Sequence, residues 1–96
     1  MAEVAKIDYY YSSVSSNLEI KKQQDRIQNV LDSKKIAYNK IDIAASEDSK
    51  AKMRKIVGDE KALAPQLANG DQYCGNFEKF EEAIEGEELE VFLKLK

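Results

Sequence analysis

Hydrophobic and polar residues alternate near the start of the chain. Over residues 4–11, the side chains of Ile7, Tyr9 and Tyr11 share one parity, and β-forming residues dominate the segment. A period of two residues is typical of a strand with one buried face. The pattern therefore predicts a first strand, with Tyr10 on the opposite face of the sheet and the tyrosines packed in the core or against a helix.

A serine-rich turn over residues 12–17 separates this strand from a helical pattern. Ser16 and Glu19 have the spacing of a capping box, in which the serine hydroxyl accepts a helix amide and the carboxylate reaches back. The spacing predicts that the first helix begins at this serine. Apolar residues then recur with helical spacing: Ile20, Ile27, Val30 and Leu31.

The second strand is predicted over residues 36–43, where the alternation slips by one position. Ile36 and Tyr38 share one parity, and Ile41 and Ile43 share the other. A β-bulge or burial on both faces explains such a slip. A second helix follows, because Ser46 is a favourable N-cap and Gly58 a natural terminator. Its apolar residues have helical spacing: Met53, Ile56 and Val57.

The last third of the chain predicts a hairpin and two helices. Residues 66–68 and 72–74 flank Asn69-Gly70, a favoured pair for a hairpin turn. Asn76 is a predicted N-cap for a third helix, which Gly86 ends, and a short helix closes the chain. The apolar residues that define these two helices are Phe77, Phe80, Ala83, Ile84, Leu89, Phe92 and Leu93.

The predicted element order is βαβαββαα. Because a helix joins the first two strands, they are expected to pair in parallel through a right-handed crossover. The hairpin adds antiparallel strands, so the fold class is α/β with a mixed sheet flanked by helices. With 96 residues, residues 1–96 are expected to form a single domain.

Charge and hydropathy exclude several classes of function. Charged residues make up 34% of the chain with a net charge of −3, a balance that gives no footprint for nucleic acid, which requires a clustered basic face. No apolar run is long enough to span a membrane, and the N-terminus has no signal-peptide core. We expect a monomer in the cytoplasm, with the nucleus left open as a second location.

The chemistry available to the chain is narrow, because it has one cysteine and no histidine. An intrachain disulfide is impossible, and a zinc site built from cysteine and histidine lacks its ligands. Histidine acid–base catalysis is excluded for the same reason. We therefore expect no metal site and no cofactor.

The element order, with a lone proline just before the hairpin, resembles the thioredoxin fold and glutaredoxins in particular. The stretches "EIKKQQ", "AYNKIDIA", "APQLANGDQYCGNFEKFEEA" and "FLKL" resemble the SH3-domain-binding glutamic-acid-rich-like family over essentially the whole chain. The resemblance implies a glutaredoxin-like domain with a four-stranded mixed sheet. It also implies that the catalytic Cys-x-x-Cys is lacking.

The position of the glutaredoxin nucleophile holds no cysteine in this chain. The resemblance places that position between Ser15 and Lys21, at the start of the first helix. There the helix dipole would stabilise a thiolate. A serine hydroxyl neither ionises near neutral pH nor forms a disulfide with glutathione. Thiol–disulfide exchange at this position is therefore excluded, and we expect no enzyme.

The resemblance also places a glutathione groove around the proline. Ala64 would lend its backbone to the tripeptide, with the Ala64–Pro65 bond in cis. Gly75 keeps the first glycine of the family's Gly-Gly turn, but Asn76 replaces the second. The acid expected to receive the γ-glutamyl amine falls on Lys79, with Glu78 one position away. The candidate binding residues, for a vestigial glutathione groove or a protein contact, are Ser12, Ser13, Ser15, Ser16, Asn17, Ala64, Pro65, Gly75 and Asn76.

Three functions remain open. The first is a non-catalytic thioredoxin-fold adaptor or modulator of redox or signalling proteins, with protein partners. The second is weak glutathione binding, or redox chemistry at Cys74, which is otherwise a small, partly buried apolar residue. The third is an adaptor that binds SH3 domains, as the family name implies, although the chain has one proline and no P-x-x-P segment.

Overall fold

The computed structural model describes residues 5–14 and 17–95. Its elements follow the predicted order, which confirms the α/β fold class with the glutaredoxin-like arrangement βαβαββαα. The bounds are β1 Ile7–Tyr11, α1 Leu18–Ser33, β2 Tyr38–Asp42, α2 Glu47–Val57, β3 Gln66–Asn69, β4 Gln72–Asn76, α3 Phe77–Glu85 and α4 Leu89–Phe92.

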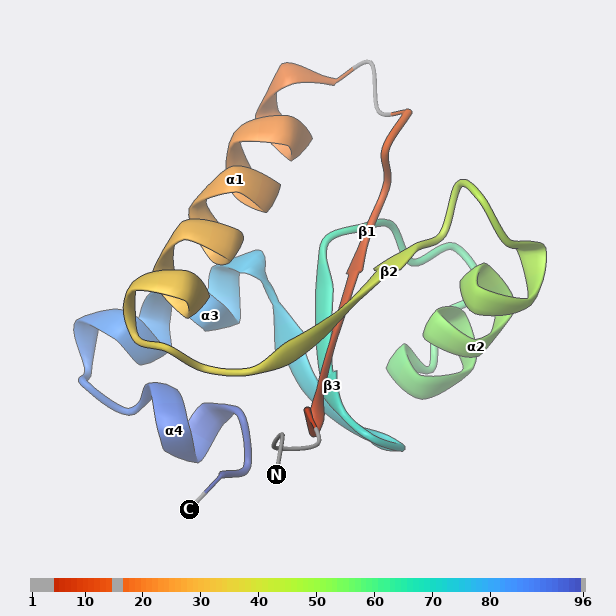
Figure 1. Cartoon of the computed structure of the whole chain (residues 1–96). Helices are drawn as coiled ribbons and strands as arrows, with labels where there is room; N and C mark the ends of the chain where they lie inside the picture. Colours follow the sequence, from red (N-terminus) through yellow and green to blue (C-terminus); the bar gives the residue numbers. More distant parts are fainter. Residues whose placement is uncertain (1–4, 15–16, 96) are drawn as a thin grey trace.

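The four strands form one mixed sheet in the order β2-β1-β3-β4. β1 pairs in parallel with β2, from Ile7 opposite Tyr38 to Tyr11 opposite Asp42. β1 also pairs antiparallel with β3, which places both central strands inside the sheet. Helices α1, α3 and α4 lie on one side of the sheet and α2 on the other, as Figure 1 shows.

Each face of the sheet carries its own apolar cluster. Ile7 and Tyr9 pack with α1, α3 and α4 on one face, whereas Tyr10 packs with Met53 of α2 on the other. The alternation predicted for β1 is therefore confirmed. The slip in the second strand results from burial on both faces, because Tyr38 contacts the first cluster and Ile41 the second, while the β1–β2 register runs without a shift.

The helix starts agree with the predicted caps at two of three places. Ser46 and Asn76 cap α2 and α3 through their side chains. At α1, however, the prediction was wrong: the N-cap is Asn17, whose Oδ1 accepts from the amide of Glu19 at 2.8 Å. Asparagine is among the strongest N-cap residues, and it stands directly before the first helical residue, Leu18. Ser16 itself lies outside the described residues.

The hairpin turn lies one residue later than predicted. Asn69 remains in β3 and pairs with Gln72, so the two turn residues are Gly70 and Asp71, with Gly70 at φ 62°. Asn69 is held in the strand because its side-chain amide donates to the carbonyl of Leu93 at 2.9 Å. A long-range contact thus overrides the local preference of the Asn-Gly pair for a turn.

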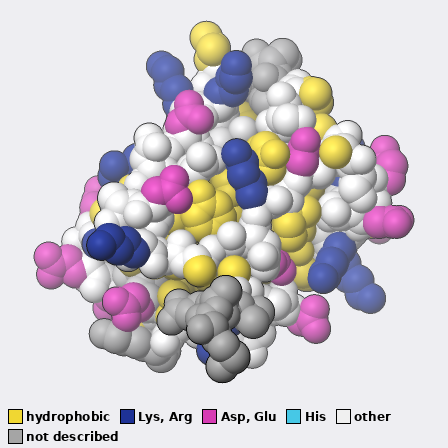
Figure 2. Space-filling view, in the orientation of Figure 1, with side chains coloured by type: hydrophobic (Ala, Val, Ile, Leu, Met, Phe, Trp, Pro, Cys, Tyr) yellow, Lys and Arg dark blue, Asp and Glu magenta, His cyan; other side chains and the backbone are white. Residues whose placement is uncertain are grey.

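The side of the molecule on which the edge strand β2 lies carries charges of both signs. Figure 2 shows Lys, Arg, Asp and Glu side chains interspersed around apolar side chains on this side of the molecule. Among the described residues in this view, no extended field of one sign is present. Such a surface attracts no polyanion by charge alone.

Removing the hydroxyl of Tyr10 is expected to leave the free energy of unfolding unchanged or to raise it by about 1 kcal/mol. This side chain is 1% exposed, and its hydroxyl has no hydrogen-bond partner in the described part of the chain. A buried donor without a partner costs stability in the folded state. Urea unfolding of Tyr10→Phe checks the expectation.

Tyr9→Phe is the matched control, because the Tyr9 hydroxyl donates to the backbone carbonyl of Gln24 at 3.0 Å. Its removal is expected to cost about 1 kcal/mol. Equal losses from the two substitutions would contradict the assignment of an unsatisfied hydroxyl at Tyr10.

Candidate functional site

The segment between α2 and β3 forms the centre of a furrow on the surface. The Ala64–Pro65 peptide bond is cis, as the resemblance implied. On one side lies a hollow of about 510 Å³ between Ser12, Val14 and Asn17, helix α2 and residues 62–64, here called the α2 hollow. On the other side, a hollow of about 400 Å³ extends to β4 and the start of α3, here called the α3 hollow. Both hollows are lined by Ile20 and residues 62–64, so they adjoin. The two hollows together are here called the furrow.

The structure brings together most of the residues that the sequence singled out. Ser12, Asn17 and Ala64 line the α2 hollow, and Ala64, Pro65 and Asn76 line the α3 hollow. Two described candidates are not brought in, and two more cannot be placed. Ser13 and Gly75 line neither hollow, and Ser15 and Ser16 lie outside the described residues.

The turn after β1 is held by a side chain that sequence reasoning missed. Gln24 of α1 is buried, and its Oε1 accepts from the amide of Ser12 at 2.8 Å while its Nε2 donates to the Ser12 carbonyl at 3.2 Å. These two bonds occupy both backbone groups of Ser12, much as a neighbouring strand would. Gln24 stands four residues after Ile20 and three before Ile27, so its spacing did place it on the apolar face of the helix, but glutamine is normally a surface residue.

Asp42 holds the next residue of the same turn. Its Oδ1 accepts from the amide of Ser13 at 3.2 Å and from the amide of Ala44 at 2.9 Å. A hydrogen bond from the Ser13 side chain, together with these amides, lowers the pKa of the Asp42 carboxyl below its ordinary 3.8. The carboxylate form is therefore the one that supports this wall of the α2 hollow.

Two cations also line the α2 hollow, and neither was proposed from sequence. Lys50 and Arg54 stand four residues apart on α2, which places them on one helix face. Arg54 donates from Nε to the carbonyl of Ala62 at 3.2 Å, which ties the helix to the cis segment. The i, i+4 spacing was visible in the sequence, but the direction in which that face points depends on the packing of α2.

The backbone of Ala64 is available for a ligand. The residue is 7% exposed, and in the described part of the chain its N–H and C=O make no hydrogen bond. Buried backbone groups are almost always paired, so an unpaired residue at the floor of a furrow indicates a place where another chain can bind.

The lone thiol does not belong to the furrow. Cys74 of β4 is half-buried against the apolar cluster under α1 and α3, and it lines neither hollow. Burial raises the pKa of its thiol above the ordinary 9.0, despite an opposing effect of Lys94. A thiol of this kind is mostly protonated at neutral pH and is a poor nucleophile.

Alkylation of Cys74 by iodoacetamide at pH 7.5 is expected to be slower in the folded protein than in the urea-unfolded chain by about tenfold or more. The reason is the raised pKa, together with the packing of the sulfur. The rate should keep rising as the pH passes 9.0, since the pKa of the thiol lies above that value and the thiolate is the reactive form. Equal rates for folded and unfolded protein would show that the thiol is exposed and activated.

The retained glycine of the glutathione motif has a packing role. A Cβ on Gly75 would lie 2.7 Å from the Phe92 ring and 2.8 Å from the Cβ of Lys79. The aromatic ring of α4 therefore occupies the space beside this glycine. Lys79, at the position expected to be acidic, forms an exposed ion pair with Glu82 at 3.5 Å. The presence of Gly75 thus follows from the fold and gives no support to glutathione binding.

Two other classes of site find no support in the residues that the structure describes. Within residues 5–14 and 17–95, no group of three or more acidic or cysteine side chains is placed to hold a metal ion. No helix in these ranges is long and apolar enough to cross a membrane.

Comparison with known proteins gives a consistent family match. Residues 5–96 match the family described as SH3-binding, glutamic acid-rich protein. The chain is 42% identical over 98 residues to the "SH3 domain-binding glutamic acid-rich protein homolog" of Drosophila melanogaster, covering 90% of this chain and 62% of that protein. It therefore spans less than two thirds of the length of that curated relative.

Solved structures show the same fold at low identity. The "C. albicans actin interacting protein Aip5" has a TM-score of 0.76 at 21% identity, covering 99% of this chain and 100% of that one. The buckwheat glutaredoxin–glutathione complex has a TM-score of 0.68 at 14% identity, covering 93% and 76%. Glutaredoxin C1 from populus tremula x tremuloides, in its holo form, has a TM-score of 0.69 at 14% identity, covering 94% and 84%. At these identities, the likeness shows the fold alone.

Proposed function

Because the chain belongs to the SH3-binding, glutamic acid-rich protein family, whose members resemble glutaredoxins in fold, we propose that it is a non-catalytic protein-binding module. The observation that carries the proposal is a furrow around a cis-proline segment, on which no cysteine is placed among the described residues. A binding surface is retained, and the nucleophile for thiol–disulfide exchange is not.

Exposed apolar side chains at the furrow support a protein partner. Val14 and Leu63 both line the α2 hollow and are 75% and 62% exposed. Large apolar side chains clustered at a concave surface are typical of interaction sites. The unpaired backbone of Ala64, which lines the same hollow, adds hydrogen bonding that an extended peptide can use.

An oxidoreductase assay separates this proposal from the redox alternative. With a glutathione mixed disulfide as substrate, we expect no turnover above the uncatalysed rate for the wild-type chain or for Cys74→Ser. An NMR amide titration with reduced glutathione at several millimolar is expected to leave residues 62–66 and 75–79 unmoved. Turnover that persists in Cys74→Ser, or saturating shifts in both segments, would overturn the proposal.

Substitution of a furrow residue tests the binding role directly, with the proteins that the chain retains as the measurement. Proteins retained by the wild-type chain are expected to be lost with Leu63→Asp. They should be kept with Val91→Asp, which places the same charge on an exposed residue of α4. Identical sets of retained proteins for both variants would argue against the furrow as the binding surface.

Binding to actin is a second candidate function. The support is the match to an actin-interacting protein of C. albicans along the full length of both chains. Co-sedimentation with filamentous actin tests it, with Leu63→Asp and Val91→Asp as the matched pair. Absence of the chain from the pellet at micromolar actin would remove this candidate.

Binding of SH3 domains through a polyproline segment has no support here. The one proline of the chain, Pro65, lies in a cis peptide on the floor of the furrow. A P-x-x-P ligand instead presents an extended polyproline helix on the surface. Any SH3 contact of this chain would have to use another mode of recognition.

A further inference from the structure

We propose that the α2 hollow binds an acidic peptide segment of the partner, which lies extended along residues 62–64 and inserts an apolar side chain between Val14 and Leu63. The inference rests on the proposed function and names the chemistry of the partner. It is carried by two cations, by apolar walls and by the unpaired backbone of Ala64 in one groove.

The charges of the α2 hollow favour an anionic guest. Lys50 and Arg54 line it together with one carboxylate, Glu47. In the described ranges, ion pairs join Arg26 to Glu81 and Lys79 to Glu82, so both cations of the hollow are left without an acidic partner. The side chains that line the hollow thus carry one more positive than negative charge, in a chain whose net charge is −3. Electrostatic complementarity then selects acidic side chains.

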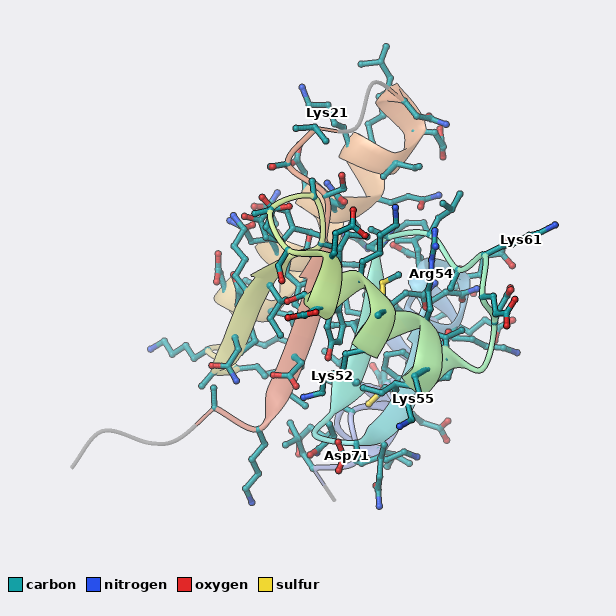
Figure 3. The ribbon with its side chains drawn as sticks, turned by 90° about the vertical axis from the view of Figure 1, so that its right-hand side faces the viewer. Lys21, Lys52, Arg54, Lys55, Lys61 and Asp71 are labelled. Atoms are coloured by element: carbon teal, nitrogen blue, oxygen red, sulfur yellow. The ribbon has the colours of Figure 1, made fainter. Side chains whose placement is uncertain are left out.

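The guanidinium of Arg54 is oriented before any ligand arrives. Its Nε is fixed on the Ala62 carbonyl, so the remaining N–H groups form a fork of constrained direction. An arginine held in this way loses little conformational freedom on binding a carboxylate. Figure 3 shows Arg54 beside the loop that follows α2, whereas Lys52 and Lys55 lie toward the hairpin turn that contains Asp71.

The apolar walls distinguish a peptide from a free anion or a nucleic acid. Val14, Ile20 and Leu63 line the hollow together with the two cations, and burial of such side chains yields free energy only to a guest that is itself partly apolar. A nucleic acid requires a broad basic surface, whereas Glu47, Asp59 and Glu60 lie near the ends of α2. An acidic segment that carries an apolar residue matches both the cations and the apolar walls of the hollow.

Fluorescence anisotropy with three labelled peptides tests the inference. Each peptide carries the same central Leu-Val pair, flanked on both sides by Glu, by Ser or by Lys. We expect the Glu peptide to bind about tenfold more tightly than the Ser peptide, since charge-assisted hydrogen bonds are involved. The Lys peptide is expected to bind most weakly. Raising the salt from about 50 to about 300 mM should narrow these differences.

Charge reversal on α2 locates the binding. Lys50→Glu is expected to weaken the Glu peptide by about tenfold. Lys52→Glu, the same change on an exposed residue outside the hollow, should alter it less than about twofold, as screened long-range charge predicts. Lys50→Glu is also expected to bind the Lys peptide more tightly than the wild type does, which a variant that had merely lost its fold would not do.

The outcomes separate this inference from the proposed function. Equal binding of the Glu and Ser peptides, with amide shifts at residues 62–64, would overturn the acidic preference and leave the binding module standing. Binding of none of the three would overturn the inference, while the Leu63→Asp comparison still decides the function. Shifts confined to α4, which lines neither hollow, would overturn both. Displacement of the Glu peptide by oligothymidylate would overturn the inference, because the ligand of the α2 hollow would then be a nucleic acid.

Discussion

Gly75→Ala is expected to lower the free energy of unfolding by about 2–4 kcal/mol, as combined overpacking and backbone strain predict. A Cβ at this position would lie 2.7 Å from the Phe92 ring, and the backbone has φ 157°. The Phe92 ring also makes an edge-on contact with Phe80, a fully buried residue, so displacement of the ring would disturb the core. Urea unfolding monitored by circular dichroism measures the loss.

Gly70→Ala is the matched control for this substitution. Gly70 also has a positive φ, 62°, but a Cβ there would meet nothing within 4 Å. The expected loss is about 1 kcal/mol, the cost of a left-handed backbone alone. In a Phe92→Ala background, the cost of Gly75→Ala should fall, because part of the steric conflict is removed. An unchanged cost in that background would show that the aromatic ring is not responsible.

Gln24→Ala is expected to destabilise the protein by about 2–3 kcal/mol, since it leaves the N–H and C=O of Ser12 without partners. Gln24 is buried, and its two hydrogen bonds to Ser12 join α1 to the end of β1. Hydrogen exchange of the Ser12 amide should accelerate along with the loss of stability. The α2 hollow should also bind its ligand less tightly, because Ser12 is part of its lining.

Two further variants show whether the lost hydrogen bonds cause the destabilisation by Gln24→Ala. Gln28→Ala truncates a glutamine of the same helix that is only partly buried, and it is expected to change stability by less than about 0.5 kcal/mol. Gln24→Glu keeps the acceptor for the Ser12 amide but loses the donor to its carbonyl, so an intermediate loss is expected. If Gln24→Glu were as stable as the wild type, the hydrogen bond from Gln24 Nε2 to the Ser12 carbonyl would contribute nothing to stability.

The binding residues were only partly accessible to sequence reasoning. Residues near the proline and before α3 were found through the resemblance, and the structure places Ala64, Pro65 and Asn76 in the furrow. Gly75 was assigned to a ligand site, yet its neighbour is Phe92, a residue seventeen positions away. A glycine motif cannot show by itself whether a ligand or a side chain approaches the backbone.

The sequence by itself determined those features that depend on neighbouring residues or on a count. Alternation in β1 assigned its two faces, because successive side chains of a strand point in opposite directions. Ser46 and Asn76 predicted two helix starts, because a cap bonds to amides two or three residues away. A single cysteine and no histidine excluded an intrachain disulfide and histidine acid–base catalysis, and no tertiary contact can supply a missing side chain.

The tertiary structure decided everything that joins residues distant in the chain. Asn69 stays in β3 because its side-chain amide donates to the carbonyl of Leu93. Gln24 is buried because its side chain makes two hydrogen bonds to the backbone at the end of β1. Lys50 and Arg54 line a hollow because α2 packs on the face of the sheet opposite α1. Such contacts depend on how the elements pack, and the free energy of that packing has no signature in a local pattern.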